Sequence, residues 1–135
     1  MSEQILLAED ENILRDANRR LLECDGYKVV AVASGEEALT LLAEGEKFDL
    51  IISDYEMRGG MDGVWLLRQI REIRRYKHCA DTPFILMSGR LDVSDDDQSS
   101  LADVAAKYGG VFFHKSKSIR EAVREFLSAN RQSDE

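Results

Sequence analysis

Five polar residues with complementary chemistry are distributed along the chain of 135 residues: Glu9, Asp10, Asp54, Ser88 and Lys115. Each ends or closely follows a short apolar run, which is where a buried strand would leave its sheet. Acids that meet at one place repel one another unless their pKa values rise or a cation neutralises them. Because Mg²⁺ prefers oxygen ligands, keeps several waters and often works with phosphate, these residue types point to a Mg²⁺ site.

Asp54 could serve such a site both as a metal ligand and as a nucleophile. It ends the stretch FDLIISD, residues 48–54, and carboxylates form acyl-phosphate intermediates in enzymes. Mg²⁺ and Lys115 would offset the charge on transferring phosphoryl oxygens. Ser88 could donate a hydrogen bond to one of these oxygens, and Gly89 would leave room for the group. Taken singly, each residue also has a purely structural explanation, but their joint occurrence at successive strand ends favours a shared site.

Five apolar runs alternate with five amphipathic segments along the chain. The runs predict strands at residues 5–8, 28–32, 48–54, 84–87 and 111–113. This alternation predicts a parallel sheet with helices on both faces, here a doubly wound, flavodoxin-like (βα)5 fold of the α/β class. The common strand order for five βα units is 2-1-3-4-5, and ligands bind beyond the carboxyl ends of its strands. The five polar residues should therefore share one edge of the sheet.

The spacing of apolar residues also predicts where helices begin and which face of each is buried. Ser34 with Glu37 fits a capping box, and Asp62 fits the N-cap of the third helix. Gly26 and Gly45 are the usual residue past a helix end. The predicted inward faces are Leu14, Ala17, Leu21 and Cys24 in the first helix, Ala38, Leu39 and Leu42 in the second, Val64, Leu67, Ile70 and Ile73 in the third, Leu101, Val104, Ala105 and Tyr108 in the fourth, and Ile119, Ala122, Val123, Phe126 and Leu127 in the last.

The composition is that of an ordinary globular domain, with 44% hydrophobic and 33% charged residues and a net charge of −8. This acidic balance argues against direct nucleic-acid binding, which needs a basic footprint. No run approaches the roughly 18 apolar residues of a membrane span. Cys24 and Cys79 follow no metal or disulfide motif, which favours reduced thiols and a cytoplasmic location. We predict one domain over residues 1–129 and a short polar tail over residues 130–135.

The spacing of several motifs is similar to that of a known family. These motifs are Glu9-Asp10, Asp54 with Met57, Met61-Asp62-Gly63, Ser88-Gly89, and Phe112 three residues before Lys115. Together they resemble the response-regulator receiver domain of two-component signalling, over nearly the whole chain. The resemblance implies that Asp54 accepts a phosphoryl group from the phosphohistidine of a sensor histidine kinase or of a histidine phosphotransfer protein.

The same resemblance implies roles for the residues around Asp54. Asp10 and Asp54 would ligate Mg²⁺ together with the backbone carbonyl of Glu56, and Glu9 would hold the metal through water. Lys115, Ser88 and Gly89 would contact the phosphoryl group, and Ser88 with Phe112 matches the family's switch pair. Glu56 and Arg90 match positions that influence phosphoryl lifetime, and these two side chains could also pair with each other.

The implied function is a phosphorylation-dependent switch and not an enzyme. Its only chemistry would be Mg²⁺-dependent self-phosphorylation from a donor and slow autodephosphorylation. Its output would be altered binding of an unknown downstream protein, or a phosphorylation-dependent dimer, through the face made by the fourth helix, fifth strand and fifth helix. Three alternatives stay open: a non-phosphorylated pseudo-receiver used for interaction, a receiver excised from a hybrid kinase or longer regulator, and an aspartate-nucleophile phosphatase that uses Glu56 as its acid.

The sequence departs from the family pattern in two loops. Ser116 follows Lys115 where the family usually has a proline preceded by a cis bond. Because a cis bond before a non-proline residue costs about 3–4 kcal/mol, we predict a trans or strained loop and a displaced start of the last helix. Lys117 is a rival for the phosphate role, but the spacing from Phe112 favours Lys115. Residues 58–60, Arg-Gly-Gly, replace another proline and lengthen the loop after Asp54, which we expect to be more mobile than usual.

Overall fold

The computed structural model describes residues 3–57, 61–89 and 100–133, with side chains described up to residue 129. Strands and helices alternate along the chain as predicted. In chain order they are β1 (Gln4–Ala8), α1 (Asn12–Cys24), β2 (Lys28–Val32), α2 (Gly35–Ala43), β3 (Leu50–Asp54), α3 (Gly63–Glu72), the 3₁₀ helix η2 (Arg74–Cys79), β4 (Phe84–Ser88), α4 (Leu101–Lys107), β5 (Val111–His114) and α5 (Ile119–Ser133).

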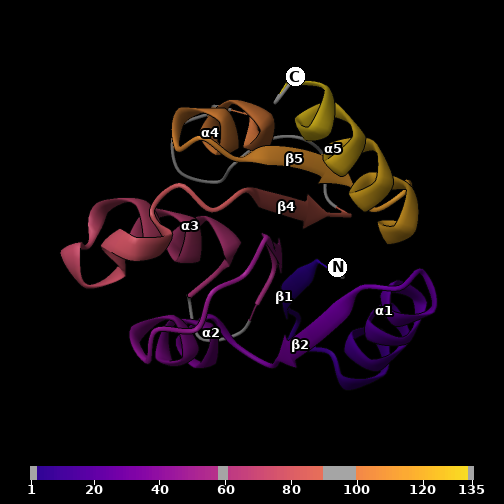
Figure 1. Ribbon diagram of the computed structural model, residues 1–135, viewed down its shortest axis with the longest axis horizontal. Helices are drawn as coiled ribbons and strands as arrows, with labels where there is room; N and C mark the ends of the chain where they lie inside the picture. The colour runs from indigo at the N-terminus through magenta and orange to yellow at the C-terminus, as the bar shows by residue number, and fades with distance from the viewer. Residues whose placement is uncertain (1–2, 58–60, 90–99, 134–135) are drawn as a thin grey trace.

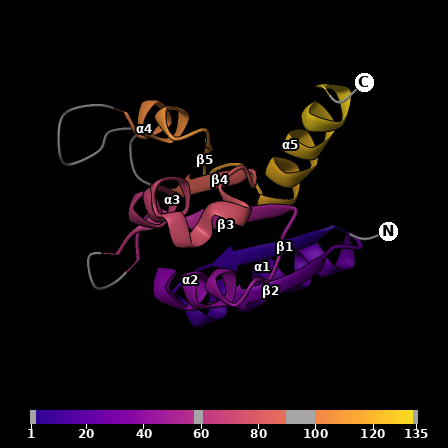
Figure 2. The ribbon, with the colours of Figure 1, turned by 60° about the vertical axis from the view of Figure 1, so that its left-hand side comes forward.

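The strands form a single parallel sheet in the order β2-β1-β3-β4-β5, which confirms the predicted fold class. Helices α1 and α5 cover one face of the sheet, and α2, α3 and α4 cover the other (Figure 1). Figure 2 follows the strands from β2 through β1, β3 and β4 to β5. Because every strand runs in the same direction, their carboxyl ends lie along one edge.

Alternating side chains of the strands divide into two hydrophobic cores, one on each face of the sheet. Leu6, Ile51 and Leu86 belong to the core that includes residues of α2, α3 and α4. Their chain neighbours on the other face, such as Ile52 and Ile85, belong to the core that includes residues of α1 and α5. Both faces are therefore covered, which explains why the strands are continuous apolar runs without polar alternation.

The predicted start and end signals of α2 are confirmed by its hydrogen bonds. Ser34 Oγ accepts a hydrogen bond from the backbone N–H of Glu37 at 3.1 Å. The Glu37 carboxylate accepts one from the backbone N–H of Ala33 at 2.9 Å, one residue before the usual capping-box partner. Gly26 and Gly45, which follow α1 and α2, have φ values of +95° and +93°, a conformation that favours glycine.

The predicted buried face of α1 is wrong. Ala17, Leu21 and Cys24 are exposed, and the buried residue of this helix is Leu22. The inward stripe runs through Leu14, Asn18 and Leu22 at intervals of four residues, and Leu14 and Asn18 are half-buried. Because the polar side chain of Asn18 interrupts this stripe, the apolar spacing pointed to the neighbouring face of the helix.

The predictions for the end of α3 and for α5 need smaller corrections. Ile73, predicted to face inward, lies beyond the last residue of α3 and is 43% exposed, whereas Leu66 is fully buried. The chain then forms η2, which was not predicted because its sequence RRYKHC has no apolar periodicity. Helix α5 extends through residues 130–133, which we expected to form a polar tail.

Arg71 joins three segments that are distant in the sequence. Its Nε donates to the carbonyl of Tyr108 at 2.7 Å, at the end of α4, and its Nη1 donates to the carbonyl of Ala80 at 2.8 Å, just after η2. The side chain is half-buried, and this burial lowers its pKa. Arg71 therefore fixes the C-terminal end of α3 against the loop that leads into β5.

We predict that Arg71→Ala lowers the free energy of unfolding by about 1–3 kcal/mol, because two carbonyls lose their donor in a partly buried place. Urea denaturation measures this difference. Arg74→Ala is the matched control, since Arg74 is an exposed arginine of the adjoining η2, and it should change stability by less than about 0.5 kcal/mol. Equal effects of the two substitutions would contradict the proposed role of Arg71 as a link.

Candidate functional site

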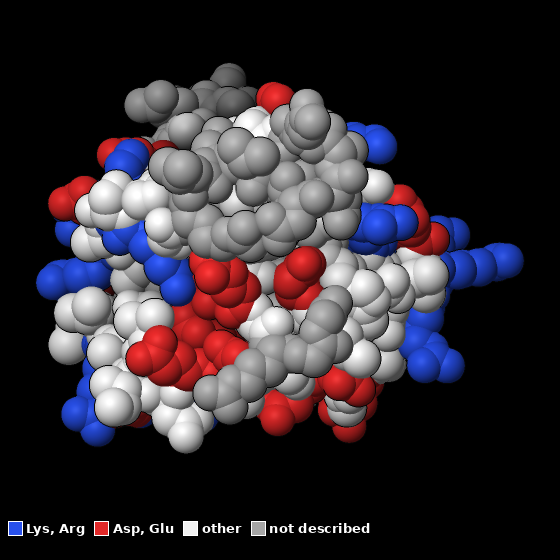
Figure 3. Space-filling model, turned by 180° about the vertical axis from the view of Figure 1, so that it is seen from behind, with Lys and Arg blue, Asp and Glu red and all other residues white. Residues whose placement is uncertain are grey.

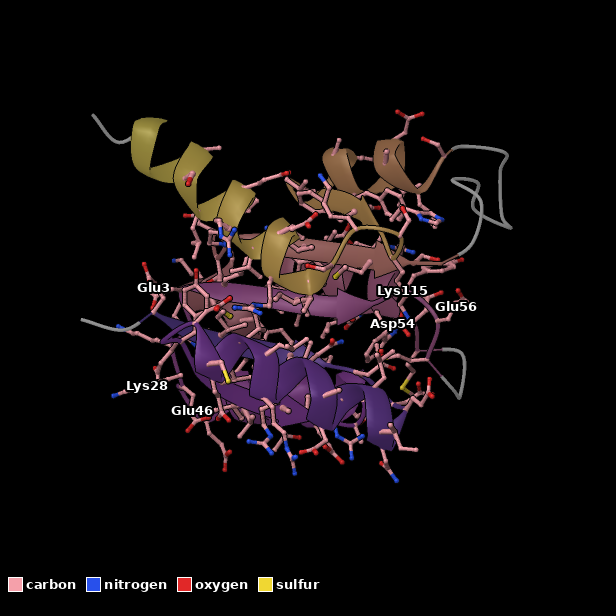
Figure 4. All side chains as sticks on the ribbon, turned by 90° about the vertical axis from the view of Figure 1, so that its right-hand side faces the viewer. Glu3, Lys28, Glu46, Asp54, Glu56 and Lys115 are labelled. Atoms are coloured by element: carbon pink, nitrogen blue, oxygen red, sulfur yellow. The ribbon has the colours of Figure 1, made fainter. Side chains whose placement is uncertain are left out.

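The carboxyl edge of the sheet brings together the residues predicted to share a site. Glu9 directly follows β1, Asp54 ends β3, Ser88 ends β4 and Lys115 directly follows β5. The strand register sets how far each residue lies along the sheet, because Ala8 pairs with Ser53 and Ser88 pairs with His114. Figure 4 shows Asp54, Glu56 and Lys115 together at this end of the strands, well away from Glu3, Lys28 and Glu46 at the other end.

The residues at this edge belong to different faces of the sheet. Ser88 is two residues beyond Leu86, which pairs with Phe112, so Ser88 and Phe112 lie on the face covered by α2, α3 and α4. Asp54 is two residues beyond Ile52, whose side chain lies in the core under α1 and α5. The site therefore spans the end of the sheet and does not lie on one face alone.

Three carboxylates are gathered beside β1 and β3. One oxygen from each of Glu9, Asp10 and Asp54 lies within 4.8 Å of the others. Glu9 is buried and Asp54 is only 6% exposed. Figure 3 views the molecule from this edge and shows acidic side chains gathered there. Such a cluster needs positive charge, since like charges at this separation are unfavourable in a partly buried place.

Lys115 supplies part of that positive charge. Its Nζ lies 3.0 Å from Asp54 Oδ1 and 3.7 Å from Glu9 Oε1. Asp54 Oδ1 is nevertheless buried without a hydrogen-bond partner of good geometry among the described residues. The contact with Lys115 is thus an ion pair that leaves this oxygen able to accept another ligand.

Burial at this edge shifts the pKa values of Glu9, Asp54 and Lys115. Burial, and after it the charge of Asp54, raise the pKa of Glu9 to about 7. Burial also raises the pKa of Asp54, against the opposing contact with Lys115. For Lys115, burial lowers the pKa, but the contact with Asp54 outweighs it and the net pKa is raised. Burial therefore disfavours the charged forms of both carboxylates, and repulsion from Asp54 adds to this effect at Glu9, so a further cation would stabilise the site.

The Met61-Asp62-Gly63 motif positions the loop after Asp54. Asp62 caps α3 by accepting a hydrogen bond from the backbone N–H of Trp65 at 2.9 Å, as predicted. Gly63 donates its backbone N–H to the carbonyl of Tyr55 at 3.0 Å. A Cβ on Gly63 would lie 2.6 Å from the backbone oxygen of Asp54 and 2.5 Å from a Leu86 methyl group. Only glycine lets α3 begin this close to the end of β3.

The loop between β5 and α5 is closed by His114. Its Nδ1 accepts a hydrogen bond from the backbone N–H of Ser116 at 3.0 Å, and its carbonyl accepts one from Lys117 at 3.0 Å. The described residues contain no cis peptide bond, which confirms the prediction of a trans loop. The Lys117 side chain pairs with Glu125 at 2.8 Å, so Lys115 is the lysine that contacts Asp54.

Two features of the site were not predicted from the sequence. Glu56 Oε1 accepts a hydrogen bond from Ser88 Oγ at 3.2 Å; the expected partner, Arg90, and the loop of residues 58–60 lie outside the described residues. A pocket of about 190 Å³ beside Asp54 is lined in part by Leu14, Asn18 and Leu21 of α1. Asn18 belongs to no motif, although a polar residue on the inward stripe of a helix is itself a signal.

Comparison with known proteins gives the family. The profile of the response regulator receiver domain matches residues 5–108, and the chain belongs to this family. The receiver domain of the hybrid histidine kinase CckA is a similar solved structure, with 32% identity, a TM-score of 0.66 and coverage of 93% of this chain and 96% of that chain. The receiver domain of Francisella response regulator 1452 has a TM-score of 0.77 at 24% identity and covers 98% of this chain and 99% of that one, which shows the same fold.

The similar curated proteins are much longer than this chain. The sensor kinase CckA of Brucella abortus is 35% identical over 130 residues, which are 93% of this chain and 13% of the kinase. The response regulator FleR of Pseudomonas aeruginosa is 46% identical over 88 residues, which are 65% of this chain and 17% of FleR. The chain thus spans less than a fifth of either relative.

Membership of the family gives the general class of function. Receiver domains are signalling switches of two-component systems that accept phosphoryl groups from histidine kinases or phosphotransfer proteins and bind Mg²⁺ at an acidic pocket. In this chain Glu9, Asp10 and Asp54 form an acidic cluster at the carboxyl edge of the sheet. Among the described residues, no helix combines the length and apolar character that crossing a membrane requires.

We predict that Gly63→Ala destabilises the protein by about 1–3 kcal/mol, the usual effect of overpacking, because the new Cβ would overlap the backbone oxygen of Asp54. Gly89→Ala is the matched control at the same edge, since its Cβ would make only an ordinary contact, 3.8 Å from Lys115. Thermal unfolding of both variants tests this difference. If Gly63→Ala is as stable as Gly89→Ala, the close approach of α3 to Asp54 is wrong.

Proposed function

We propose that Asp54 is the phosphoacceptor of this receiver domain and that its phosphorylation alters the binding of a partner protein. The observation that carries the proposal is the buried Asp54 carboxylate, which has an oxygen without a hydrogen-bond partner among the described residues and lies 3.0 Å from Lys115. A carboxylate with a free lone pair and an adjacent cation is suited to attack a phosphorus atom.

The donor we propose is a phosphohistidine of a sensor histidine kinase or of a histidine phosphotransfer protein. An oxygen of Asp54 forms a bond to phosphorus while the bond from phosphorus to the imidazole nitrogen breaks. The electron pair of that bond stays on the nitrogen, which takes up a proton from water, and the products are an acyl phosphate on Asp54 and a neutral imidazole. Lys115, held between Asp54 and Glu9, is placed to neutralise charge on the phosphoryl oxygens.

The residues of the cluster also fit the Mg²⁺ that the family binds. Asp10 and Asp54 would hold it directly, with the backbone carbonyl of Glu56, and Glu9 would hold it through water. The lone pair of Asp54 Oδ1 and the unbalanced charge of the three acids support this assignment. When bound, Mg²⁺ would offset negative charge on the phosphoryl group.

The proposed output uses Ser88 and Phe112, which lie on the same face of the sheet. Ser88 would turn to donate to a phosphoryl oxygen, and the half-buried ring of Phe112 would move into the space it leaves. This changes the surface of α4, β5 and α5, where a downstream protein or a second copy of the chain would bind. Both arrangements exist beforehand, and phosphorylation shifts their populations.

We propose that the phosphodonor approaches Asp54 through the pocket beside it. This pocket is lined in part by Leu14 and Leu21 of α1, and the adjoining outer surface of α1 carries Ile13, which is 82% exposed. We propose that the phosphodonor protein contacts α1 here, since Leu14 and Leu21 border the pocket beside Asp54.

We predict that incubation with phosphoramidate and Mg²⁺ adds one phosphoryl group to the wild-type protein and none to Asp54→Asn, measured by intact-mass spectrometry. Asp81→Asn, which replaces an exposed aspartate away from the edge, is the control and should be modified like the wild type. A wild type that stays unmodified would contradict the proposal, and label on Asp54→Asn would place the phosphoacceptor elsewhere. Repeated turnover of a phosphomonoester would instead support the phosphatase alternative.

We predict that Mg²⁺ raises the free energy of unfolding by about 1.4 kcal/mol at ten times its Kd, because it binds only the folded state. Asp10→Asn should abolish most of this gain, whereas Glu11→Gln, which replaces an exposed acid outside the cluster, should keep it. Urea denaturation with and without MgCl₂ measures the effect. An equal gain in all three proteins would show that Mg²⁺ acts elsewhere on the acidic surface.

A further inference from the structure

Glu56 and Ser88 are connected across the edge of the sheet by a hydrogen bond between residues 32 positions apart. Ser88 Oγ donates to Glu56 Oε1 at 3.2 Å. Ser88 is completely buried, whereas Glu56 is exposed. A fully buried hydroxyl that is the proposed contact for the phosphoryl group is thus already bonded to a carboxylate.

The backbone holds Glu56 in position for this bond. Tyr55, the residue before Glu56, donates its N–H to the carbonyl of Met87 at 2.7 Å, and its carbonyl accepts from Gly63 at 3.0 Å. These two bonds continue the pairing of β3 and β4 one residue past Asp54 and join it to the start of α3. Glu56 therefore leaves the sheet directly beside the end of β4, where Ser88 lies.

The two possible acceptors compete for one proton. A serine hydroxyl has a single hydrogen to donate, and an ionised carboxylate only accepts. Phosphoryl oxygens are likewise strong acceptors. Ser88 can therefore donate either to Glu56 or to a phosphoryl group on Asp54, but not fully to both.

The negative charge of Glu56 also opposes a phosphoryl group on Asp54. Glu56 lies close enough to the centre of the site that its charge contributes to raising the pKa values of both Asp54 and Lys115, after the larger effects of burial and of the contact between these two residues. A phosphoryl group adds about −1.5 to −2 charges at this place. The carboxylate of Glu56 would repel this charge as well as occupy the hydroxyl.

We propose that Glu56 is a positioning residue that restrains Ser88 in the unmodified protein and thereby opposes the switch. Phosphorylation has to break the Ser88–Glu56 hydrogen bond before Ser88 can turn to the phosphoryl group and leave space for the ring of Phe112. This inference rests on the proposed function of Asp54. It assigns to Glu56 a role in the equilibrium of the switch, separate from any effect on phosphoryl lifetime.

The test uses beryllium fluoride, which mimics the phosphoryl group. The full chain is titrated with it in the presence of Mg²⁺, and isothermal titration calorimetry measures the Kd. Glu56→Ala removes both the acceptor and the charge, and we expect it to lower the Kd about threefold to tenfold, the usual size of one hydrogen bond. Glu56→Gln keeps an acceptor oxygen and removes the charge, so its Kd should fall between those of Glu56→Ala and the wild type.

Ser88→Ala separates the hydrogen bond from the charge in a double-mutant cycle. In the Ser88→Ala background, Glu56→Ala should lower the Kd by clearly less than it does when Ser88 is present. The same factor in both backgrounds would overturn the proposal, because Glu56 would then act through charge alone. An unchanged or higher Kd for Glu56→Ala would also overturn it. Without beryllium fluoride, Glu56→Ala should unfold at a slightly lower temperature than the wild type, because it removes one hydrogen bond of the unmodified protein.

The wild-type titration keeps this test separate from that of the proposed function. Binding of beryllium fluoride by the wild type and not by Asp54→Asn supports the phosphoacceptor, whatever the Glu56 variants do. Absence of binding by the wild type would overturn the proposed function, and with it the inference that depends on it.

Discussion

The site depends on one constraint, which is that like charges are held close together at the carboxyl edge of the sheet. Glu9 and Asp54 are buried next to Asp10, and Lys115 contacts Glu9 and Asp54. A parallel sheet in the order β2-β1-β3-β4-β5 creates this confinement. It places β1 beside β3, and Lys115, which follows β5, reaches Asp54 at the same edge of the sheet. The hydrophobic cores on both faces supply the stability that holds the charges together.

Close backbone packing keeps this edge in place. Gly63 lets α3 start against the backbone oxygen of Asp54, where a Cβ would overlap it. His114 closes the loop after β5 through its hydrogen bond from Ser116, so the loop that carries Lys115 is ordered with only trans peptide bonds among the described residues. The substitution of Ser116 for the usual proline is thus accommodated by a local side-chain bond.

Most of the fold could be predicted because it depends on patterns that are local in sequence. The ends of the strands, the caps at Ser34 and Asp62, and the turn at Gly26 are each determined by a few neighbouring residues. The buried face of α1 could not, since Asn18 lies on the inward stripe and breaks the apolar spacing. The convergence of Asp54 and Lys115 followed from topology, but the Ser88–Glu56 bond depends on side-chain conformations that no local pattern determines.

The division of the site between two faces of the sheet limits how a change at Asp54 can be transmitted. Asp54 belongs to the side covered by α1 and α5, whereas Ser88 and Phe112 belong to the side covered by α2, α3 and α4. β3 and β4 are buried along their whole length and paired on both sides, so a signal cannot pass through the middle of the sheet without disrupting it. It has to pass around the carboxyl edge, where Ser88 Oγ lies within reach of the loop after Asp54. Because this hydroxyl has one hydrogen to donate, in the switch that we propose its partner is either Glu56 or the phosphorylated Asp54, and this choice between two acceptors would make the response two-state.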